Sequence, residues 1–204
     1  MKRTDRRGEQ GMSLLEMMVI LVVMGIAAAF FAPLVHNLIL RSKLEGAARD
    51  TAALMQRARL EAVKRAAPAI VRIDEASGRF QAFVDIDGTT AGSPPDGLFN
   101  PVAGQALGRT DFEIGVSALP PHVILDAPGT DPAVDALTTI AGEKVARFLA
   151  NGSIETIGAV RLADPRQNFL EVRIEPQATA RVSVRKWDGT AWFGRGEGEP
   201  WTWN

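Results

Sequence analysis

One carboxylate lies at the start of an apolar N-terminal segment, where a charge is unfavourable in free energy. Glu16 directly precedes the run from Met17 to Val35, which contains no charged residue. An acid near the centre of a membrane helix costs roughly 2.5 to 3.5 kcal/mol on insertion scales, and less near the end of the helix. A nearby cation would neutralise such a carboxylate, so the chemistry expected of Glu16 is charge pairing. The alternative is that Glu16 snorkels to water at the membrane surface.

A second group of acids lies in the middle of the chain. Asp85, Asp87 and Asp96 loosely match a calcium-binding loop, but Thr90 stands where that loop requires glycine. Because Asp-Gly is also a strong hairpin signal, a tight turn at residues 87–88 is the better interpretation of this segment.

The remaining candidate residues do not form a catalytic pattern. Asn151-Gly152-Ser153 fits the N-glycosylation signal, but Asn-Gly between two strand-like segments primarily indicates a tight turn. The only histidines are His36, just past the apolar run, and His122, at the start of an expected strand. The chain has no cysteine, no metal-spaced cluster and no G-x-S-x-G elbow. We therefore expect no enzyme activity, no cofactor and no metal.

Composition describes a folded domain with an apolar appendage. Of the 204 residues, 46% are hydrophobic and 23% are charged, and the net charge is −1. Residues 1–11 carry four basic and two acidic residues, a balance of +2, which leaves −3 for the remainder. This distribution gives no sign of a nucleic-acid binder driven by bulk charge.

The apolar run is long enough to cross a bilayer once. Its 19 residues, Met17 to Val35, would span about 28 Å as a helix at ~1.5 Å per residue. The basic residues before it predict a cytoplasmic N-terminus and an outer C-terminal part. A removable secretory signal, with Ala27 to Ala29 as the cleavage site, is the alternative. The acid at position 16 and the helical character after the alanines count against it.

Helix-forming residues continue well past the apolar run, with no proline between Pro33 and Pro68. We predict one helix from about Ser13 to about Arg65, apolar all round in its first half and amphipathic in its second. Pro33 should bend it, because proline removes a backbone donor and clashes with the preceding turn. A small-to-apolar stripe at helical spacing predicts the buried face of the second half: Leu44, Ala47, Thr51, Met55, Ala58 and Ala62.

After the helix the pattern changes to short, alternating segments separated by turn signals. The expected strands are 69–74, 79–86, 122–126, 144–150, 169–175 and 180–187, and the expected turns are 77–78, 87–88, 151–152 and 188–189. Residues 88–110 are rich in glycine and proline and predict a long exposed loop. The predicted fold class is α+β, with an antiparallel sheet packed against the stripe of the helix.

The last residues of the chain hold all four tryptophans: Trp187, Trp192, Trp201 and Trp203. These side chains either cap the core of the sheet or form a surface that binds a partner, because tryptophan is enriched at interface hot spots.

The N-terminal residues resemble the processing site of type IV prepilins. Gly11-Met12-Ser13-Leu14-Leu15-Glu16 matches the pattern of glycine, a hydrophobic residue, a small hydroxyl residue, two leucine-like residues and glutamate. Members often have phenylalanine where this chain has Met12. The resemblance implies a pilin-like fold, cleavage between Gly11 and Met12, and N-methylation at Met12. Pro33 would be the twenty-second mature residue, a position where pilin-like helices commonly kink.

Residues 57–65, the strands after them, and 145–154 resemble the GspH/FimT branch of this family, which contains the minor pseudopilin H of type II secretion systems. The resemblance implies a minor pseudopilin assembled near the tip of a periplasmic fibre that drives protein export. It implies as partners other pseudopilins, the prepilin peptidase, the inner-membrane assembly platform and secreted cargo. It also implies a single-pass inner-membrane protein with a periplasmic C-terminal domain.

The expected division of the chain follows from this resemblance together with the residue patterns. It comprises a leader at 1–11, a transmembrane assembly helix at 12–35, the amphipathic half of the helix at 36–67, a β-rich domain at 68–187 and a tryptophan-rich tail at 188–204.

A FimT-like minor pilin that acts in pilus assembly or DNA uptake is the alternative function. That role is associated with a basic C-terminal region, whereas residues 186–204 carry two basic and three acidic residues, so we do not expect nucleic acid among the partners.

Overall fold

The computed structural model describes residues 13–86, 95–99 and 111–194, and leaves out the side chains of residues 32 and 33. The chain divides into two compact units, residues 1–39 and 40–204. One helix, α1 (Leu14–Arg65), runs through both units, and its bounds confirm the prediction from the sequence. The bend expected at Pro33 stays a prediction.

In the first unit, the side chains of α1 are exposed almost without exception, including those of Leu14, Leu21 and Phe30. This segment is long and apolar enough to cross a membrane. Exposed apolar residues continue past the predicted membrane run to Leu38 and Ile39, which are 68% and 47% exposed. The first unit therefore presents an apolar surface that its own chain does not cover.

In the second unit, α1 has a buried face and ends at a recognisable cap. Every residue of the predicted stripe is buried, from Leu44 to Ala62. Ala66 adopts a positive φ of 51°, and the Ala67 N–H donates to the Ala62 carbonyl at 3.2 Å. Such a left-handed residue with a long backward hydrogen bond is a common helix end. Lys64 and Arg65 in the last turn complement the helix dipole.

The strands form two antiparallel sheets, where the sequence predicted one. The first has the order β3-β2-β1-β7-β6, and the second β11-β10-β9-β8-β4, with β5 also paired to β8. The bounds are β1 (Ala69–Asp74), β2 (Arg79–Val84), β3 (Phe112–Ala118), β4 (Ile124–Leu125), β5 (Val134–Asp135), β6 (Thr138–Ile140), β7 (Glu143–Phe148), β8 (Gly158–Ala163), β9 (Phe169–Ile174), β10 (Val182–Trp187) and β11 (Trp192–Gly194).

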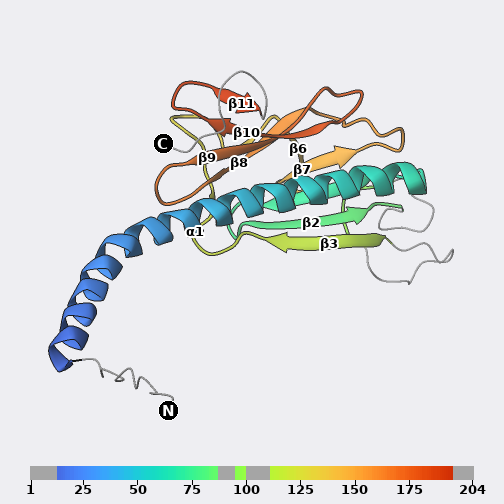
Figure 1. Ribbon diagram of the computed structural model, residues 1–204. Coiled ribbons are helices and arrows are strands. Elements are labelled where there is room, and N and C mark those ends of the chain that lie inside the picture. Colours follow the sequence, from blue (N-terminus) through green and yellow to red (C-terminus); the bar gives the residue numbers. More distant parts are fainter. Residues whose placement is uncertain (1–12, 87–94, 100–110, 195–204) are drawn as a thin grey trace, which may run out of the picture. The chain divides into compact units, whose positions relative to one another are not determined.

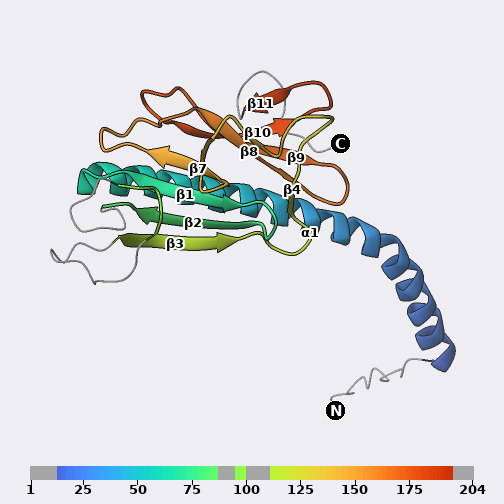
Figure 2. The ribbon, with the colours of Figure 1, turned by 180° about the vertical axis from the view of Figure 1, so that it is seen from behind.

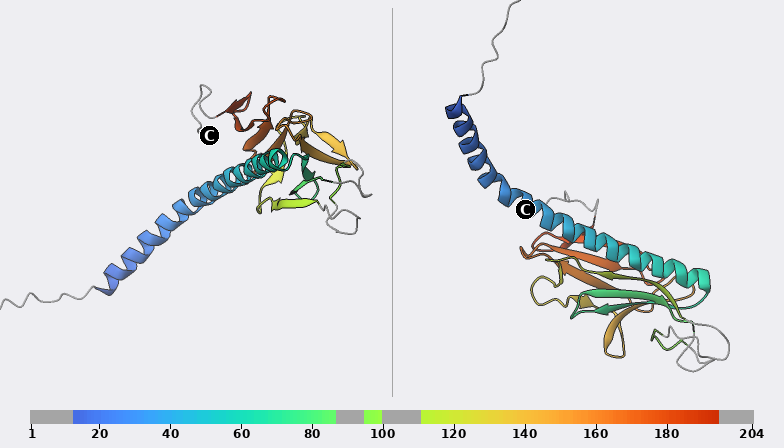
Figure 3. Two further views of the ribbon diagram at one scale, coloured as in Figure 1. Left: turned by 90° about the vertical axis from the view of Figure 1, so that its right-hand side faces the viewer. Right: turned by 90° about the horizontal axis from the view of Figure 1, so that it is seen from below.

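The second half of α1 packs against both sheets. In Figures 1 and 2, β2 and β3 are drawn below this helix segment and β8 to β10 above it, and the right-hand view of Figure 3 shows the helix along one side of the strands. A single core cluster joins Leu44 and Met55 of the helix to Val71 and Phe80 of the first sheet and Leu170 of the second. The α+β fold class predicted from the sequence is confirmed.

Five predicted strands, at 69–74, 79–86, 144–150, 169–175 and 180–187, agree with β1, β2, β7, β9 and β10 to within two residues. The strand expected at 122–126 is correct only for its two central residues, because His122 has a φ of 75° and lies in a turn beside two prolines. The turns at Gly78, Gly152 and Gly189 are confirmed by positive φ angles. The turn expected at 87–88 lies outside the described residues, as does most of the 88–110 loop.

Candidate functional site

The functional motif begins just before the described part of the chain. Gly11 and Met12 lie outside the described residues, so the processing site itself stays a prediction. The Met17 N–H donates to the Ser13 carbonyl at 3.1 Å, which places the start of helical hydrogen bonding at Ser13. Glu16 therefore lies in the first turn of α1, where the helix dipole favours a negative charge.

Glu16 is exposed and surrounded by apolar side chains. Leu15 and Met17, its immediate neighbours, are 71% and 50% exposed. Among the described residues, none forms an ion pair with Glu16. The geometry is that of a charge at the end of an uncovered apolar helix, available to a cation from outside the described chain.

The two histidines and the Asn151 motif do not form a catalytic or binding site in the described part of the chain. His36 is exposed on α1 and His122 is exposed in a turn. The Asn151 side chain accepts the Ser153 N–H at 3.0 Å and the Ser153 hydroxyl at 2.6 Å, so it closes the turn that contains Gly152. The interpretation of this motif as a tight turn is confirmed.

The acids of the loosely matched calcium loop are used within the fold. Asp85 is fully buried, and its Oδ2 accepts the Gly97 N–H at 2.6 Å. The Asp96 side chain accepts the Leu98 N–H at 2.9 Å. Asp87 and Thr90 lie outside the described residues. Within the described ranges, no three acidic or histidine side chains are placed to hold a metal ion.

Asp85 holds a short segment against the outer face of the first sheet. The Phe99 ring contacts Phe83 of β2 at a centroid distance of 5.2 Å, and both belong to a small cluster with Ile70 and Val145. Burial raises the pKa of Asp85 to about 6, and the negative charges of Asp111 and Asp96 add to the rise, while the Gly97 hydrogen bond opposes it. Nothing in the sequence pattern indicated this contact.

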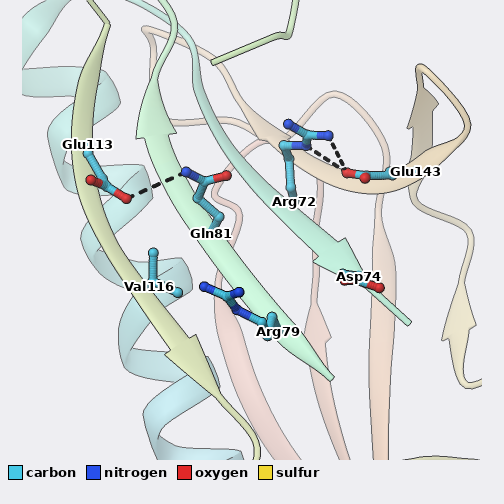
Figure 4. Close-up of a pocket in the computed structure, with 7 residues that line it drawn as sticks. All are labelled: Arg72, Asp74, Arg79, Gln81, Glu113, Val116 and Glu143. Carbon is cyan, nitrogen blue, oxygen red and sulfur yellow. Dashed lines mark hydrogen bonds and ion pairs between the residues drawn. The ribbon is translucent and has the colours of Figure 1, made fainter. Parts of the chain in front are cut away.

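The other half of that outer face is an open polar groove, shown in Figure 4. A cavity of about 320 Å³ is lined by Arg72, Asp74, Arg79, Gln81, Glu113, Val116 and Glu143. The side chains come from four neighbouring strands, β1, β2, β3 and β7. This surface was not predictable from the sequence patterns because β3 shows no strand signal, although Arg72, Arg79 and Gln81 alternate with buried residues in the predicted strands.

Charges in the groove are only partly paired. The Arg72 Nε donates to Glu143 Oε2 at 2.7 Å, whereas the Gln81 amide is 3.5 Å from Glu113 Oε1. Arg79 is exposed, and its guanidinium points across the groove toward Val116 (Figure 4). The residues that line the groove contain no nucleophile-and-base pair.

Two sequence models match the chain. The type II transport protein GspH model matches residues 47–186, and the prokaryotic N-terminal methylation motif matches residues 6–32. No curated protein matches the chain significantly.

Two solved structures are similar at low identity. The minor pseudopilin EpsH from the type 2 secretion system of Vibrio cholerae has 15% identity and a TM-score of 0.44, with 76% of this chain and 99% of that chain covered. The type IV minor pilin FimU of Pseudomonas aeruginosa has 15% identity and a TM-score of 0.39, with 74% and 93% covered. Because both TM-scores are below 0.5, the family of this chain is concluded from the sequence models alone.

The GspH model spans the second half of α1 and the strands from β1 into β10, and the methylation motif spans the N-terminal residues. Both matches agree with the resemblance found in the sequence. Since the GspH model covers well over half of the chain, the protein belongs to the type II transport protein GspH family and is a minor pseudopilin, a structural and non-enzymatic subunit of type II secretion.

Proposed function

We propose that this chain is cut between Gly11 and Met12 by a prepilin peptidase, methylated at Met12, and then assembled near the tip of a periplasmic pseudopilus. Family membership implies assembly with other pseudopilins in a fibre, and together with the apolar helix it indicates a membrane-anchored protein with a periplasmic domain. In our proposal the anchor is a single pass through the inner membrane. The inner-membrane assembly platform and the secreted cargo are the other partners.

The uncovered apolar segment of α1 supports this proposal best. The side chains from Leu14 to Ile26 are exposed in the isolated chain, so they require either lipid or the helices of other subunits to cover them. The same surface serves both states: lipid covers it before assembly, and neighbouring helices cover it in the fibre.

Glu16 supplies the specific step in this scheme. Cleavage creates an ammonium group at Met12, and methylation keeps its charge. In the fibre, the Glu16 carboxylate of one subunit would face the N-terminal amine of its neighbour, so that two charges that are costly in an apolar setting neutralise each other. The uncut precursor has no such amine, and assembly would therefore depend on processing. Pro33 would bend the helix between its membrane and periplasmic halves.

N-terminal sequencing of the mature protein tests the processing step. We expect a methylated Met12. A start at Phe30 would instead show removal of an ordinary secretory signal and would refute the proposal.

Replacement of Glu16 by alanine tests the pairing step. We expect normal cleavage but loss of the subunit from sheared fibres, because the neighbour's amine would be left unpaired among apolar side chains. Asp50→Ala is a matched control, since Asp50 is an exposed acid on the same helix. Normal incorporation of Glu16→Ala, or equal loss in the control, would contradict the pairing.

A further inference from the structure

The two sheets end in edge strands of very unequal length. Strands β6 and β11 have three residues each, and β4 and β5, which both pair with β8, have two each, whereas β3 has seven. Seven residues offer an edge of about 23 Å at ~3.3 Å per residue. Very short edge strands are one way in which proteins prevent unwanted pairing of their sheets. Within the described residues the other edge strands are short and β3 is long, although the β2–β3 register shifts once, between Ala82 and Phe83.

Strand β3 also lacks the residues that usually protect a long edge. Its sequence, FEIGVSA, contains no lysine, arginine or proline, and its only charge is Glu113. Phe112 and Val116 are 40% and 47% exposed. Within the described part of the chain, β3 is paired only with β2. Such an edge is suited to accept an extended strand from another polypeptide, with main-chain hydrogen bonds supplying affinity.

The groove beside β3 adds a preference for charge. Arg79 lies opposite Ala118 in the β2–β3 register, and the small alanine side chain leaves room above it for the long arginine. A strand added to β3 would place its side chains about 10 Å from β2, two strand spacings away. A carboxylate at that distance is within reach of the Arg79 guanidinium. Arg72 is not available in the same way, because Glu143 already pairs with it.

We propose that β3 is the docking edge for an extended segment of another subunit of the fibre, which adds a strand to the first sheet and places a carboxylate beside Arg79. This inference rests on the proposed function, because it takes the partner from the same fibre. The neighbouring subunit would contact β3, which lies far in sequence from the N-terminal assembly helix. The outer face of the first sheet would then select that subunit by its charge.

Site-specific photo-crosslinking of the full-length protein in its own cells tests the proposal. A benzophenone amino acid at Val116 should crosslink to another fibre subunit, and mass spectrometry should map the adduct to an extended segment of that subunit with an acidic residue. Thr139 is the matched control position, because it is exposed on β6 at the opposite edge of the same sheet. Adducts that map within the same chain, or equal partner adducts from both positions, would overturn the proposal.

Two charge variants test the role of Arg79. Arg79→Glu should lower the crosslink yield from position 116 by at least about tenfold, because like charges across an interface are strongly unfavourable. Arg181→Glu, which reverses another exposed arginine, should leave the yield unchanged. Charge reversal of the acid mapped on the partner should restore the crosslink. Equal effects of the two variants would overturn the role of Arg79.

Fibre incorporation is measured in the same cells, which separates failure of the proposed function from failure of the docking edge. If the subunit is absent from fibres even without substitution, the proposed function fails. If it is present but position 116 gives no partner adduct, only the docking edge is wrong.

Discussion

Replacing Asp85 by asparagine should remove one pH-dependent contribution to the folding stability of this protein. Asp85 is fully buried at the end of β2, and its Oδ2 accepts the Gly97 N–H. Its Oδ1 is buried and has no hydrogen-bond partner among the described residues. Asp111 and Asp96 face it with like charges, and the positive charge of Arg147 acts in the opposite direction. The ionised form of Asp85 is therefore poorly accommodated in the fold.

The magnitude follows from the pKa. The pKa of Asp85 rises from its ordinary value of 3.8 to about 6 in the folded protein. A difference of about two pH units corresponds to about 3 kcal/mol at ~1.36 kcal/mol per unit. Because the folded pKa is the higher one, this contribution is fully present below about pH 4 and is lost as the pH rises through 6. Above that range, folding retains an ionised carboxylate that would be better solvated in the unfolded chain.

Asparagine keeps an acceptor for the Gly97 N–H but does not titrate. The free energy of unfolding of Asp85→Asn relative to the parent should therefore rise with pH, by up to about 3 kcal/mol between pH 4 and pH 7.5. Comparison of the two proteins at each pH cancels the contributions of all other titrating groups.

The measurement is urea unfolding of the detergent-solubilised full chain across this pH range, followed by tryptophan fluorescence. All four tryptophans lie at residues 187–203 and so report on the periplasmic part. Asp131→Asn, at an exposed position, is the control and should show no trend with pH. A pH-independent difference between Asp85→Asn and the parent would refute the reasoning.

Three further substitutions and one control test buried contacts. Met55→Ala should lower the free energy of unfolding by about 2 to 5 kcal/mol, because Met55 is fully buried between helix and sheets, whereas Leu60→Ala, 66% exposed on the same helix, should change it by less than about 0.5 kcal/mol in the same urea assay. Gly158→Ala should lower the melting temperature measurably, since an added Cβ would lie 2.6 Å from a backbone oxygen of β5; an unchanged melting curve would contradict this close approach. Glu171→Ala should cost about 3 kcal/mol in urea unfolding, because Arg161, now 2.9 Å from that carboxylate, would keep only the half-exposed Asp135 at 3.3 Å as an ion-pair partner; a cost below about 1 kcal/mol would show that the buried pair contributes little.

Periodicity made the helix and its buried stripe predictable. The residues from Leu44 to Ala62 are spaced for one face of a helix, and each of them is buried. Strands β1 and β9 were predictable because β-branched and aromatic residues cluster between turn signals. These patterns are local, so they are visible without knowledge of the fold.

Among the strands of six or more residues, two were not predictable by the same means, for opposite reasons. Every residue of β8 is buried, so its sequence, GAVRLA, shows no alternation between an inner and an outer face. Strand β3 lies at an edge and is at least partly exposed along its whole length. In both strands, the alternation of buried and exposed residues is absent because of what covers the two faces of the strand. The residues that cover these faces come from distant parts of the chain.

The functional residues divide in the same way. The processing motif and Glu16 could be identified because they occupy consecutive or closely spaced positions. The groove of Arg72, Arg79, Glu113 and Glu143 was not identified, because it draws one or two residues from each of four strands. The buried contact between Asp85 and Gly97 was also missed, since twelve residues separate the two groups and no spacing rule connects them.

The sequence by itself therefore determined the membrane helix, the expected processing step, the class of fold and the family. Each of these depends on residues that are close together in the chain, where hydrophobic period and motif spacing are directly visible. Only the tertiary structure decided that there are two sheets, that the described residues cover one half of the outer face of the first sheet and line a groove on the other, and that β3 is its long edge strand. These features depend on pairing between residues as far apart in the chain as Ala69 and Phe148, and that pairing is selected by burial of the whole core and not by any local pattern.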